Sequence, residues 1–531
     1  MKGEVNPDAY LKPDSMKLRS YFGLIIALFI YFVTAIVLIG YFQYDFGPGA
    51  DGICYLSIAQ KYALGNFEDA VNGYWSPLFS WLLVPFLLKG FSQVSALKSA
   101  WILSIIIGSF NIIGMYFLTF KFKINQLLRT FFIFSLIPVT LCFVFFMLTS
   151  DLLMSSFLIF YLNFIFDPKY QNNLTIGLFC GLTGGLAYLS KSFAFPFFLV
   201  HYLIFNAIYY FKKYKKNETI LKNLLIGLTV FFLIAGAWSF QISEKYGYLT
   251  IGTSGTYNYN ALGPDIQLNH PMNMFGTVSH PNPTAITPWE DPSYVKLYPW
   301  SPFDSIQSFT YQVNIFIKNI VKSIFILFTF SPLILPIIIL SILMFFKSPN
   351  KQVKWAILCL MVTFIIFILG YLPFFVDLRY FYFLFYLVIF LGFYLIKVLN
   401  ENYNIENKIF NTILVLFFIF LILSPTITLI NYSNNKAIYT VSENLKDEYK
   451  IQGNIASDSL ALQTLHLSYY LDSPFYGSTD TYSQELEKGL EENDIDYYLV
   501  WNPTKKINLA HYKEINPAEQ NLPRIFKHES E

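Results

Sequence analysis

The chain has 531 residues, of which 55% are hydrophobic and only 13% charged, and 36 Lys and Arg against 34 Asp and Glu give a formal net charge of +2. Soluble globular chains average about 25% charged residues, so this deficit and the many long apolar runs indicate a polytopic membrane protein. The sequence has no basic stripe and no DNA-binding motif, so we expect no nucleic-acid partner. Its four cysteines form neither a disulfide framework nor a zinc-binding spacing.

The apolar segments define the expected membrane-spanning helices. A polar N-terminal segment precedes the first apolar run, which lacks a small-residue cleavage site, so we expect a retained helix and not a cleaved signal peptide. Because a helix needs roughly 20 apolar residues to cross the hydrocarbon core, we predict about eleven spans. They lie at 20–42, 97–120, 126–148, 150–166, 173–190, 192–211, 222–242, 322–346, 353–373, 378–398 and 408–430.

Basic residues between the spans predict the orientation, because cytoplasmic loops are enriched in Lys and Arg. With a cytoplasmic N-terminus, the extracytoplasmic face receives the loops 43–96 and 244–311 and the C-terminal segment. We therefore expect a multi-pass cell-membrane protein with a transmembrane domain, 1–431, and an extracytoplasmic domain, 432–531. The basic residues that fall on the cytoplasmic side are Lys12, Lys17, Arg19, Lys121, Lys123, Arg129, Lys212, Lys213, Lys215, Lys216, Lys347, Lys351, Lys354, Lys397 and Lys408.

The segment after the first span carries the most informative carboxylate, Asp51. Asp51 opens a helix-like run that ends at Gly65, and helical spacing places Tyr55 on the same face as Asp51. A carboxylate at the bilayer edge is a candidate general base facing a lipid-borne substrate. Aspartate is also a favoured helix N-cap, so a purely structural role stays open. Asp45, in a turn rich in Gly and Pro, ranks below Asp51 as a second carboxylate.

Three further charged residues lie at the expected outer ends of spans. Asp151 opens the fourth span, where N-capping is again a full alternative. Lys191 and Arg379 lie on the face where positive charge is disfavoured, and two cations there suit a phosphate at headgroup depth. The structural alternatives are snorkelling for Lys191 and a pair with Asp377 for Arg379.

The 244–311 loop is rich in Pro, Asn and aromatic residues. Trp289 and Trp300 are candidates for stacking on a sugar face, although such side chains also pack against a membrane or a neighbouring domain. His270 and His280 have no metal-binding partner at short spacing. We therefore expect no cofactor, and the spacing does not support a divalent metal.

The C-terminal 100 residues alternate between short strands and helices. The sequence predicts strands in NIASDS, PFYG and Asp496–Trp501, with helices over Leu460–Leu471 and Tyr482–Asn493. This alternation is typical of a small α/β layer. Asp494-Ile-Asp496 matches the DxD box of soluble glycosyltransferases, but it precedes a strand and lies on the outer side, so we interpret it as a chance match.

The ordered set of motifs resembles the type C (GT-C) glycosyltransferases, which include protein O-mannosyltransferases and the aminoarabinose transferases of lipid A. Those relatives commonly carry Asp-Glu at the acidic site, where this chain has Asp51-Gly52, and the WWD-type motif of oligosaccharyltransferases is absent, which argues against en bloc transfer to asparagine. The matching stretches are Asp51-Gly-Ile-Cys-Tyr55, WSPLFSWLL at 75–83, Thr149-Ser-Asp151, GLAYLSK ending at Lys191, and Leu378-Arg379-Tyr380.

The resemblance implies an α-helical, polytopic GT-C-like fold with a small C-terminal α/β domain. It implies an inverting enzyme that moves one hexose or pentose from a polyprenyl- or dolichyl-phosphate donor to an acceptor glycan, lipid or protein. In this reading Asp51 is the general base, and the second acidic role stays open, to Asp151 as the candidate or to no residue. Donor-phosphate binding falls to Lys191, Arg379 and Tyr380, and substrate binding to Tyr55, Tyr74, Trp75, Trp289 and Trp300. The alternatives are a flippase or transporter of lipid-linked sugars, a polysaccharide polymerase or ligase, and an inactive GT-C scaffold.

Overall fold

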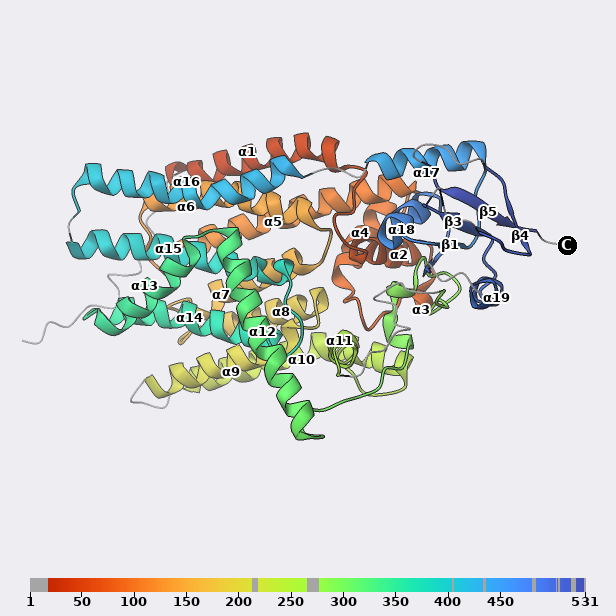
Figure 1. Cartoon of the computed structure of the whole chain (residues 1–531). Helices are drawn as coiled ribbons and strands as arrows, with labels where there is room; N and C mark the ends of the chain where they lie inside the picture. The colour runs from red at the N-terminus through yellow and green to blue at the C-terminus, as the bar shows by residue number, and fades with distance from the viewer. Residues whose placement is uncertain are drawn as a thin grey trace, which may run out of the picture.

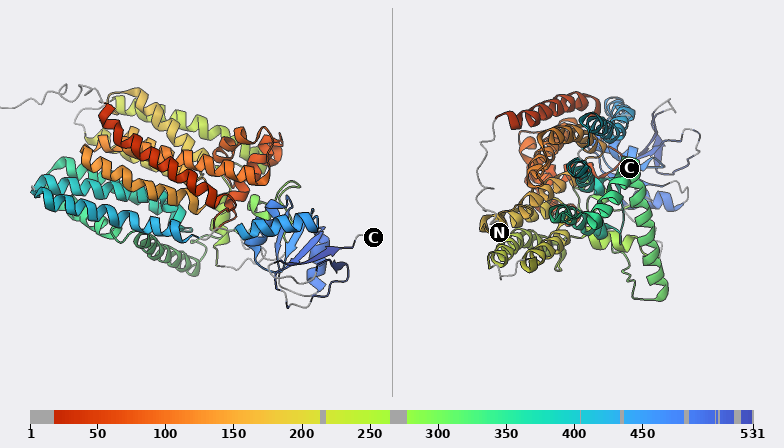
Figure 2. Two further views of the ribbon diagram at one scale, coloured as in Figure 1. Left: turned by 90° about the horizontal axis from the view of Figure 1, so that it is seen from above. Right: turned by 90° about the vertical axis from the view of Figure 1, so that its left-hand side faces the viewer.

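A computed structural model describes residues 18–212, 218–264, 277–403, 405–432, 436–479, 484–502, 504, 507–516 and 522–529. Apolar helices run side by side in a bundle, and a small sheet domain lies beyond one end of it (Figures 1 and 2). Within the described residues, nine helices are long and apolar enough to cross a membrane. The bundle contains α1 (Leu18–Phe42), α5 (Gln93–Lys121), α6 (Gln126–Phe146), α7 (Asp151–Ile165), α8 (Leu174–Ser190), α9 (Ala194–Lys212), α10 (Glu218–Tyr246), α12 (Ile306–Phe330), α13 (Ile334–Lys347), α14 (Lys351–Tyr371), α15 (Tyr382–Tyr403) and α16 (Asn407–Asn431).

Most predicted spans match these helices to within a few residues, but the span predicted at 322–346 is wrong. Two helices, α12 and α13, cover this region, because the helix is interrupted at Ser331. Ser331 is extended, with φ −158° and ψ 127°, and it precedes Pro332, which disfavours helical backbone at the residue before it. α12 also begins at Ile306, inside the predicted 244–311 loop, so that loop is shorter than expected. Among the basic residues used for orientation, Lys12, Lys17, Lys213, Lys215 and Lys216 lie outside the described residues.

Polar residues fix where several bundle helices begin. The side chains of Ser92, Asn125, Asn173, Ser305 and Asn350 each accept a hydrogen bond from a main-chain N–H in the first turn of α5, α6, α8, α12 and α14. These caps satisfy N–H groups that have no partner within the helix. The first residues of these five helices are therefore determined by the local sequence.

α8 and α10 approach each other closely through glycines. A Cβ atom on Gly181 would lie 2.2 Å from the main-chain oxygen of Gly227, so any larger residue would push the helices apart. Apolar helices in a bilayer gain little from the hydrophobic effect, and close packing of small residues is the main source of their association. This contact holds α8, and with it Lys191 at its C-terminal end.

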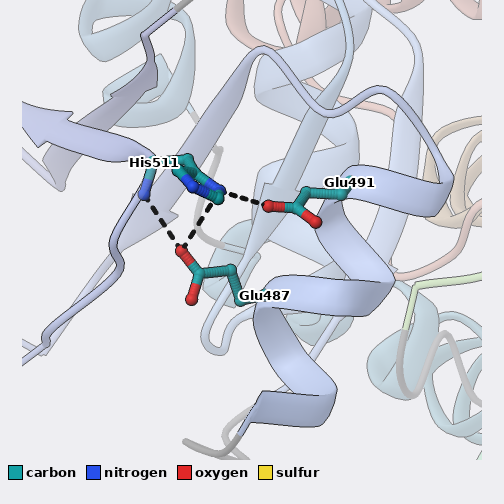
Figure 3. A group of neighbouring side chains, drawn as sticks. All are labelled: Glu487, Glu491 and His511. Carbon is teal, nitrogen blue, oxygen red and sulfur yellow. Dashed lines mark hydrogen bonds and ion pairs between the residues drawn. The ribbon is translucent and has the colours of Figure 1, made fainter.

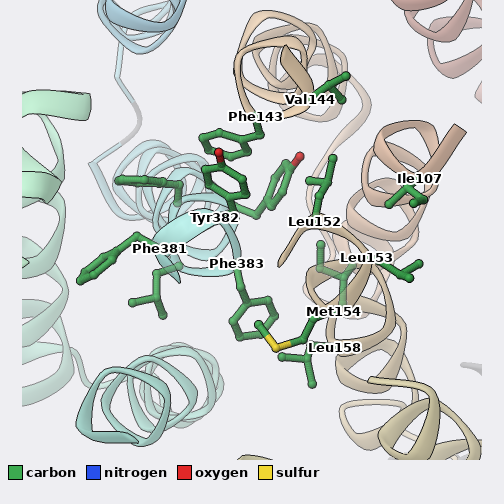
Figure 4. Packing of buried hydrophobic residues seen from close by; sticks show 14 of the residues in the cluster. Ile107, Phe143, Val144, Leu152, Leu153, Met154, Leu158, Phe381, Tyr382 and Phe383 are labelled. Carbon is green, nitrogen blue, oxygen red and sulfur yellow. The ribbon is translucent and has the colours of Figure 1, made fainter. Parts of the chain in front are cut away.

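Among the nine long apolar helices of the described residues, the span that contains α15, Leu378–Tyr403, is the most enclosed. Figure 4 shows Tyr382 and Phe383 of α15 between Phe143 of α6 and Met154 and Leu158 of α7. The rings of Phe143 and Tyr382 stack with centroids 4.1 Å apart. The start of α15 is thus held rigidly, directly after the turn that carries Arg379.

Short helices cover the end of the bundle nearest the sheet domain. The segment between α1 and α5 forms α2 (Asp51–Ala63), α3 (Phe67–Ala70) and α4 (Leu78–Leu87). The α10–α12 connection forms α11 (Ser254–Ala261), η3 (Pro288–Glu290) and η4 (Pro292–Tyr294), and η5 (Leu378–Phe381) joins α14 to α15. The predicted helix from Asp51 is confirmed, and Gly65, with φ +82°, follows its end.

The C-terminal part is a five-stranded sheet in the order β2-β1-β3-β5-β4. β1 (Ile455–Ser457) pairs in parallel with β2 (Phe475–Ser478) and β3 (Tyr497–Val500), and β5 (Arg524–His528) pairs antiparallel with β3 and β4 (Tyr512–Glu514). Helices α17 (Lys436–Glu448), α18 (Ala461–Tyr470) and α19 (Gln484–Glu492) accompany the strands. The predicted α/β alternation is confirmed, whereas β4, β5 and α17 were not predicted, because their charged residues hide the apolar pattern.

Candidate active site

A polar cavity of about 70 Å³ lies where α2, the starts of α7 and α9, α11 and η5 meet. Eight of the ten residues predicted from the sequence line it, although they come from segments up to 329 residues apart. The lining residues are Asp51, Tyr55, Tyr74, Trp75, Ser76, Thr149, Asp151, Lys191, Ser192, Ser254, Asn258, Arg379 and Tyr380.

A glycine turn brings Asp51 to the cavity. Gly47 has φ +80°, and a Cβ atom there would lie 2.6 Å from the main-chain oxygen of Phe146. Only glycine therefore fits where this turn passes the end of α6. Asp45 stabilises the turn by accepting the Gly47 N–H at 2.9 Å, which gives this second carboxylate a structural contact. Asp51 is then the first residue of α2, is 6% exposed, and forms an ion pair with Arg379.

Asp151 reaches the same cavity from the start of α7. It is 2% exposed and forms an ion pair with Lys191. Neither Asp51 nor Asp151 acts as an N-cap: the cap positions are Ala50 and Ser150, and neither makes a side-chain capping bond. The capping alternative is therefore wrong for both carboxylates, and each is paired with a partly buried cation.

The two cations are partly exposed, and each faces a carboxylate of the cavity. Lys191 ends α8 in an extended conformation, and its Nζ lies 4.0 Å from the ring centroid of Tyr380. Arg379 lies in η5, where Asp377 accepts its main-chain N–H at 3.2 Å. The guanidinium Nε is 4.0 Å from Asp377, so the expected alternative pair exists only as a long contact beside the ion pair with Asp51.

Two buried polar atoms at the cavity have no hydrogen-bond partner among the described residues: Nε of Arg379 and Oγ1 of Thr149. Buried donors and acceptors without partners are costly, and they commonly mark a place where a ligand binds. Both atoms suit the oxygens of a phosphate or a sugar. Thr149 was quoted in the sequence motif but was not predicted as a binding residue.

Tyrosine hydroxyls also surround the carboxylates. Tyr55 shares a hydrogen bond of 2.6 Å with Ser150, and Tyr74 donates to Asn258 at 3.1 Å. Burial raises the pKa of both tyrosines, so they stay protonated and serve as hydrogen-bond donors rather than bases. The basic groups of the site are the carboxylates.

The predicted tryptophans separate into two environments. Trp75 lines the cavity and donates from Nε1 to the main-chain oxygen of Trp289 at 3.2 Å. Trp289 lies behind that wall, with its ring edge-on to Tyr74 at 5.2 Å. Trp300 does not line the cavity; it stacks on Tyr259 at 4.7 Å, with 3° between the ring planes.

Sequence reasoning missed a buried ion pair beside the cavity, between Lys61 of α2 and Glu290 of η3. The two residues are 229 positions apart, so no spacing rule connects them. The one signal was a lysine within an otherwise mostly apolar short helix. The polar residues Ser76, Ser192, Ser254 and Asn258 were missed as well, because they belong to no motif.

One group of metal-ligating side chains occurs among the residues that the structure describes, and it lies on the sheet domain: Glu487, Glu491 and His511 (Figure 3). His511 already uses its main-chain N–H and its ring in contacts with these two carboxylates. His280 has its ring nitrogens against the main-chain oxygens of Ala285 and Phe475, and burial lowers its pKa to about 4. His270 lies outside the described residues.

A second, apolar cavity of about 530 Å³ adjoins the polar one. The two cavities are lined by neighbouring residues of the same segments. Leu189 and Val71 line the apolar cavity, whereas Lys191 and Tyr74 line the polar one. The apolar cavity is lined by Tyr62, Phe67, Val71, Trp81, Leu189, Ile234, Ala237, Trp238 and Gln241.

Solved structures share this fold over nearly the whole chain. ArnT from Cupriavidus metallidurans, bound to undecaprenyl phosphate, matches with a TM-score of 0.54 at 10% identity, over 95% of this chain and 98% of that chain. The apo oligosaccharyltransferase of Archaeoglobus fulgidus gives 0.51 at 12% identity, over 91% of this chain and 70% of that chain. No family model and no curated protein sequence matches the chain. The protein thus has the fold of GT-C membrane glycosyltransferases, as the sequence motifs indicated.

Proposed function

We propose that this protein is a glycosyltransferase that moves a single sugar from a polyprenyl-phosphate donor to an acceptor at the extracytoplasmic face of the cell membrane. The observation that carries the proposal is the meeting of Asp51, Asp151, Lys191 and Arg379 at one cavity of a GT-C fold. We further propose that the N-terminus is cytoplasmic and that the cavity and the domain from 432 onward are extracytoplasmic, as the basic loops predict.

Lys191 and Arg379 hold the donor phosphate in this proposal. Nε of Arg379 makes no hydrogen bond among the described residues, and guanidinium and ammonium groups together suit a phosphate monoanion or dianion. ArnT, which shares the fold, binds undecaprenyl phosphate, a ligand of the class proposed here. Tyr380 supports this role because its ring lies against both cations.

Phosphate binding changes the partners of the carboxylates. Without donor, Asp51 is neutralised by Arg379 and Asp151 by Lys191. A phosphate competes for both cations and leaves Asp51 with less positive charge beside it, which makes it a stronger base. The ion pairs thus keep the charged groups compensated until the donor arrives.

The transfer step then needs no further reactant. Asp51 accepts the proton of the acceptor hydroxyl or amine as that oxygen or nitrogen forms a bond to the anomeric carbon. The bond from the anomeric carbon to the phosphate oxygen breaks, and its electron pair leaves with the polyprenyl phosphate. Lys191 and Arg379 stabilise the negative charge that grows on this leaving group. A single displacement inverts the anomeric configuration.

The apolar cavity suits the hydrocarbon chain of the donor. Its volume of about 530 Å³ and its aromatic lining contrast with the polar cavity, which is too small and too charged for a prenyl chain. Apolar cavities of roughly 300–1,000 Å³ with few polar groups are the usual form of ligand sites. A lipid phosphate placed across Leu189 and Lys191 would put its head and its chain in matching surroundings.

Transfer assays with purified protein in liposomes test the proposal. Wild type and Asp51→Asn are supplied with polyprenyl-phosphate hexoses and pentoses together with candidate acceptor lipids and glycans, and release of polyprenyl phosphate is measured. We expect release with wild type and a loss of about 10²–10⁴-fold with Asp51→Asn, the range for removal of a general base.

Three other outcomes decide between the alternatives. Equal turnover by both proteins would remove Asp51 as the base. Movement of intact lipid-linked sugar across the bilayer without release would indicate a flippase. Transfer of an oligomeric glycan in preference to a single sugar would indicate a polymerase or ligase.

A further inference from the structure

The ion pair between Lys61 and Glu290 is the most enclosed one that the structure describes outside the polar cavity. Lys61 is 5% exposed and Glu290 is 0% exposed. Glu290 also accepts a hydrogen bond from the Ser57 hydroxyl at 2.7 Å, and its main-chain oxygen accepts one from Asn72 at 2.7 Å. Removing one partner of such a pair leaves a buried charge without its counter-charge, which strongly destabilises the folded state.

This pair lies on the helix that carries Asp51 but on a different face. Ser57 and Lys61 are four residues apart and share one face of α2, whereas Asp51 and Tyr55 share the face toward the polar cavity. α2 has only 13 residues, and isolated helices of this length are marginal in water. The position of Asp51 therefore depends on the contacts that hold α2.

Glu290 belongs to a segment, residues 277–294, that we name the strap. The strap is bound to the edge strand β2 of the C-terminal sheet: Val278 donates to the main-chain oxygen of Tyr476 at 2.8 Å, and Phe475 donates to that of Ile286 at 2.9 Å. His280 adds a ring contact, stacked on Tyr476 with centroids 4.0 Å apart. The strap thus connects the sheet with α2.

We propose that Glu290 is a positioning residue for Asp51: its ion pair with Lys61 fixes α2 to the strap, and the strap fixes α2 to the C-terminal sheet. This role gives the C-terminal domain a function in the reaction, as a support for the helix that carries the base. The reaction itself rests on the proposed function, but the position of α2 does not.

Cys54 reports on the position of α2 without any assay of transfer. It lies in α2 and is 0% exposed. In a chain with Cys142, Cys180 and Cys359 replaced by Ala, labelling by a maleimide then measures how often α2 leaves its site. We expect Glu290→Gln to label at least about tenfold faster than wild type, because it leaves Lys61 buried without its counter-charge. Glu244→Gln, at an exposed position near the end of α10, is the control with the same change of charge and should label at the wild-type rate.

Two further variants separate position from charge. Lys61→Met combined with Glu290→Gln removes both charges and, with them, the ion pair that links α2 to the strap. No uncompensated charge is left, so we expect labelling slower than in Glu290→Gln but still at least about threefold faster than wild type. His280→Ala removes the ring stack on Tyr476 and the contact of the imidazole with the main-chain oxygen of Phe475, and we expect labelling about threefold faster. Unchanged labelling in His280→Ala would overturn the link to the sheet.

Activity supplies the second readout. Glu290→Gln should lower kcat at least about tenfold with the donor KM within about twofold, because the phosphate site keeps Lys191 and Arg379. The double variant should recover only part of kcat. Wild-type labelling of Glu290→Gln would overturn the inference. Wild-type labelling of the double variant would overturn it too, because it would trace the effect of Glu290→Gln to the uncompensated charge of Lys61 and not to the lost link. If wild type transfers no sugar, the proposed function fails, while the labelling rates still decide the position of α2.

Discussion

The polar and the apolar cavity lie against the same three segments but have opposite chemistry. α2, residues 71–76 and the C-terminal end of α8 contribute to both. The polar cavity, about 70 Å³, contains two ion pairs, whereas the apolar cavity, about 530 Å³, has no charged residue among its described lining. A lipid phosphate unites these two chemistries in one molecule. The comparison teaches that the lining changes from apolar to charged within two positions of the chain, from Leu189 to Lys191.

The largest expected effect comes from the carboxylates of the polar cavity. Asp51→Asn should lower kcat by about 10²–10⁴-fold with little change in donor affinity, since the amide cannot accept the proton. Asp151→Asn should act mainly on donor affinity, because Lys191 loses the partner that orients it. Single-turnover rates and donor binding, measured separately, distinguish the two variants. The reverse pattern, with Asp151→Asn losing the chemical step, would exchange the roles of the two carboxylates.

Arg379 should follow in size. Arg379→Lys keeps the charge but loses the planar fork that can grip a phosphate and Asp51 together, so we expect kcat/KM to fall by about 10²-fold. Lys322→Arg is the matched exchange in the opposite direction, because the ammonium of Lys322 lies over the ring of Phe375, outside the polar cavity. We expect it to change kcat/KM by less than about twofold, as is usual for substitutions at exposed sites. Full activity of Arg379→Lys would show that charge alone is sufficient.

The apolar cavity should show a smaller effect that depends on the chain. Ala237→Trp fills part of it, so we expect the KM for a long-chain donor to rise about tenfold, while a donor with a short prenyl chain is affected less than about twofold. Leu233→Trp, on α10 but outside the cavity lining, is the control. An equal effect on long and short donors would place the chain elsewhere.

The same contrast explains what sequence could predict. Asp51, Asp151, Lys191 and Arg379 stand out because a charge beside an apolar span is rare, and the topology bias marks cations on the outer face. Most spans follow from apolar length alone. The site could therefore be predicted as a set of residues, and the structure adds which acid meets which cation.

Features formed by long-range packing could not be predicted. The Lys61–Glu290 pair joins residues that no motif connects, and the apolar cavity is lined by side chains such as Val71 and Ile234 that look like any membrane residue. The break at Ser331 had a local signal, Pro332, but the apolar run on both sides concealed it. Hydropathy detects length, whereas a cavity depends on which faces meet.

The smallest expected effect separates two tryptophans that sequence could not rank. Trp289→Ala should lower kcat/KM by about tenfold, because its ring supports Tyr74 and its removal loosens the aromatic wall of the polar cavity. Trp300→Ala should change kcat/KM by less than about twofold, because its ring packs on Tyr259 and Tyr311 and does not line the polar cavity. Both variants remove an indole from the same loop, so their difference in kcat/KM, measured beside thermal unfolding, isolates contact with the site from loss of packing. An equal loss of activity in both would mean that Trp300 reaches substrate when the donor is bound, and the sugar-stacking role expected from the sequence would then extend to it.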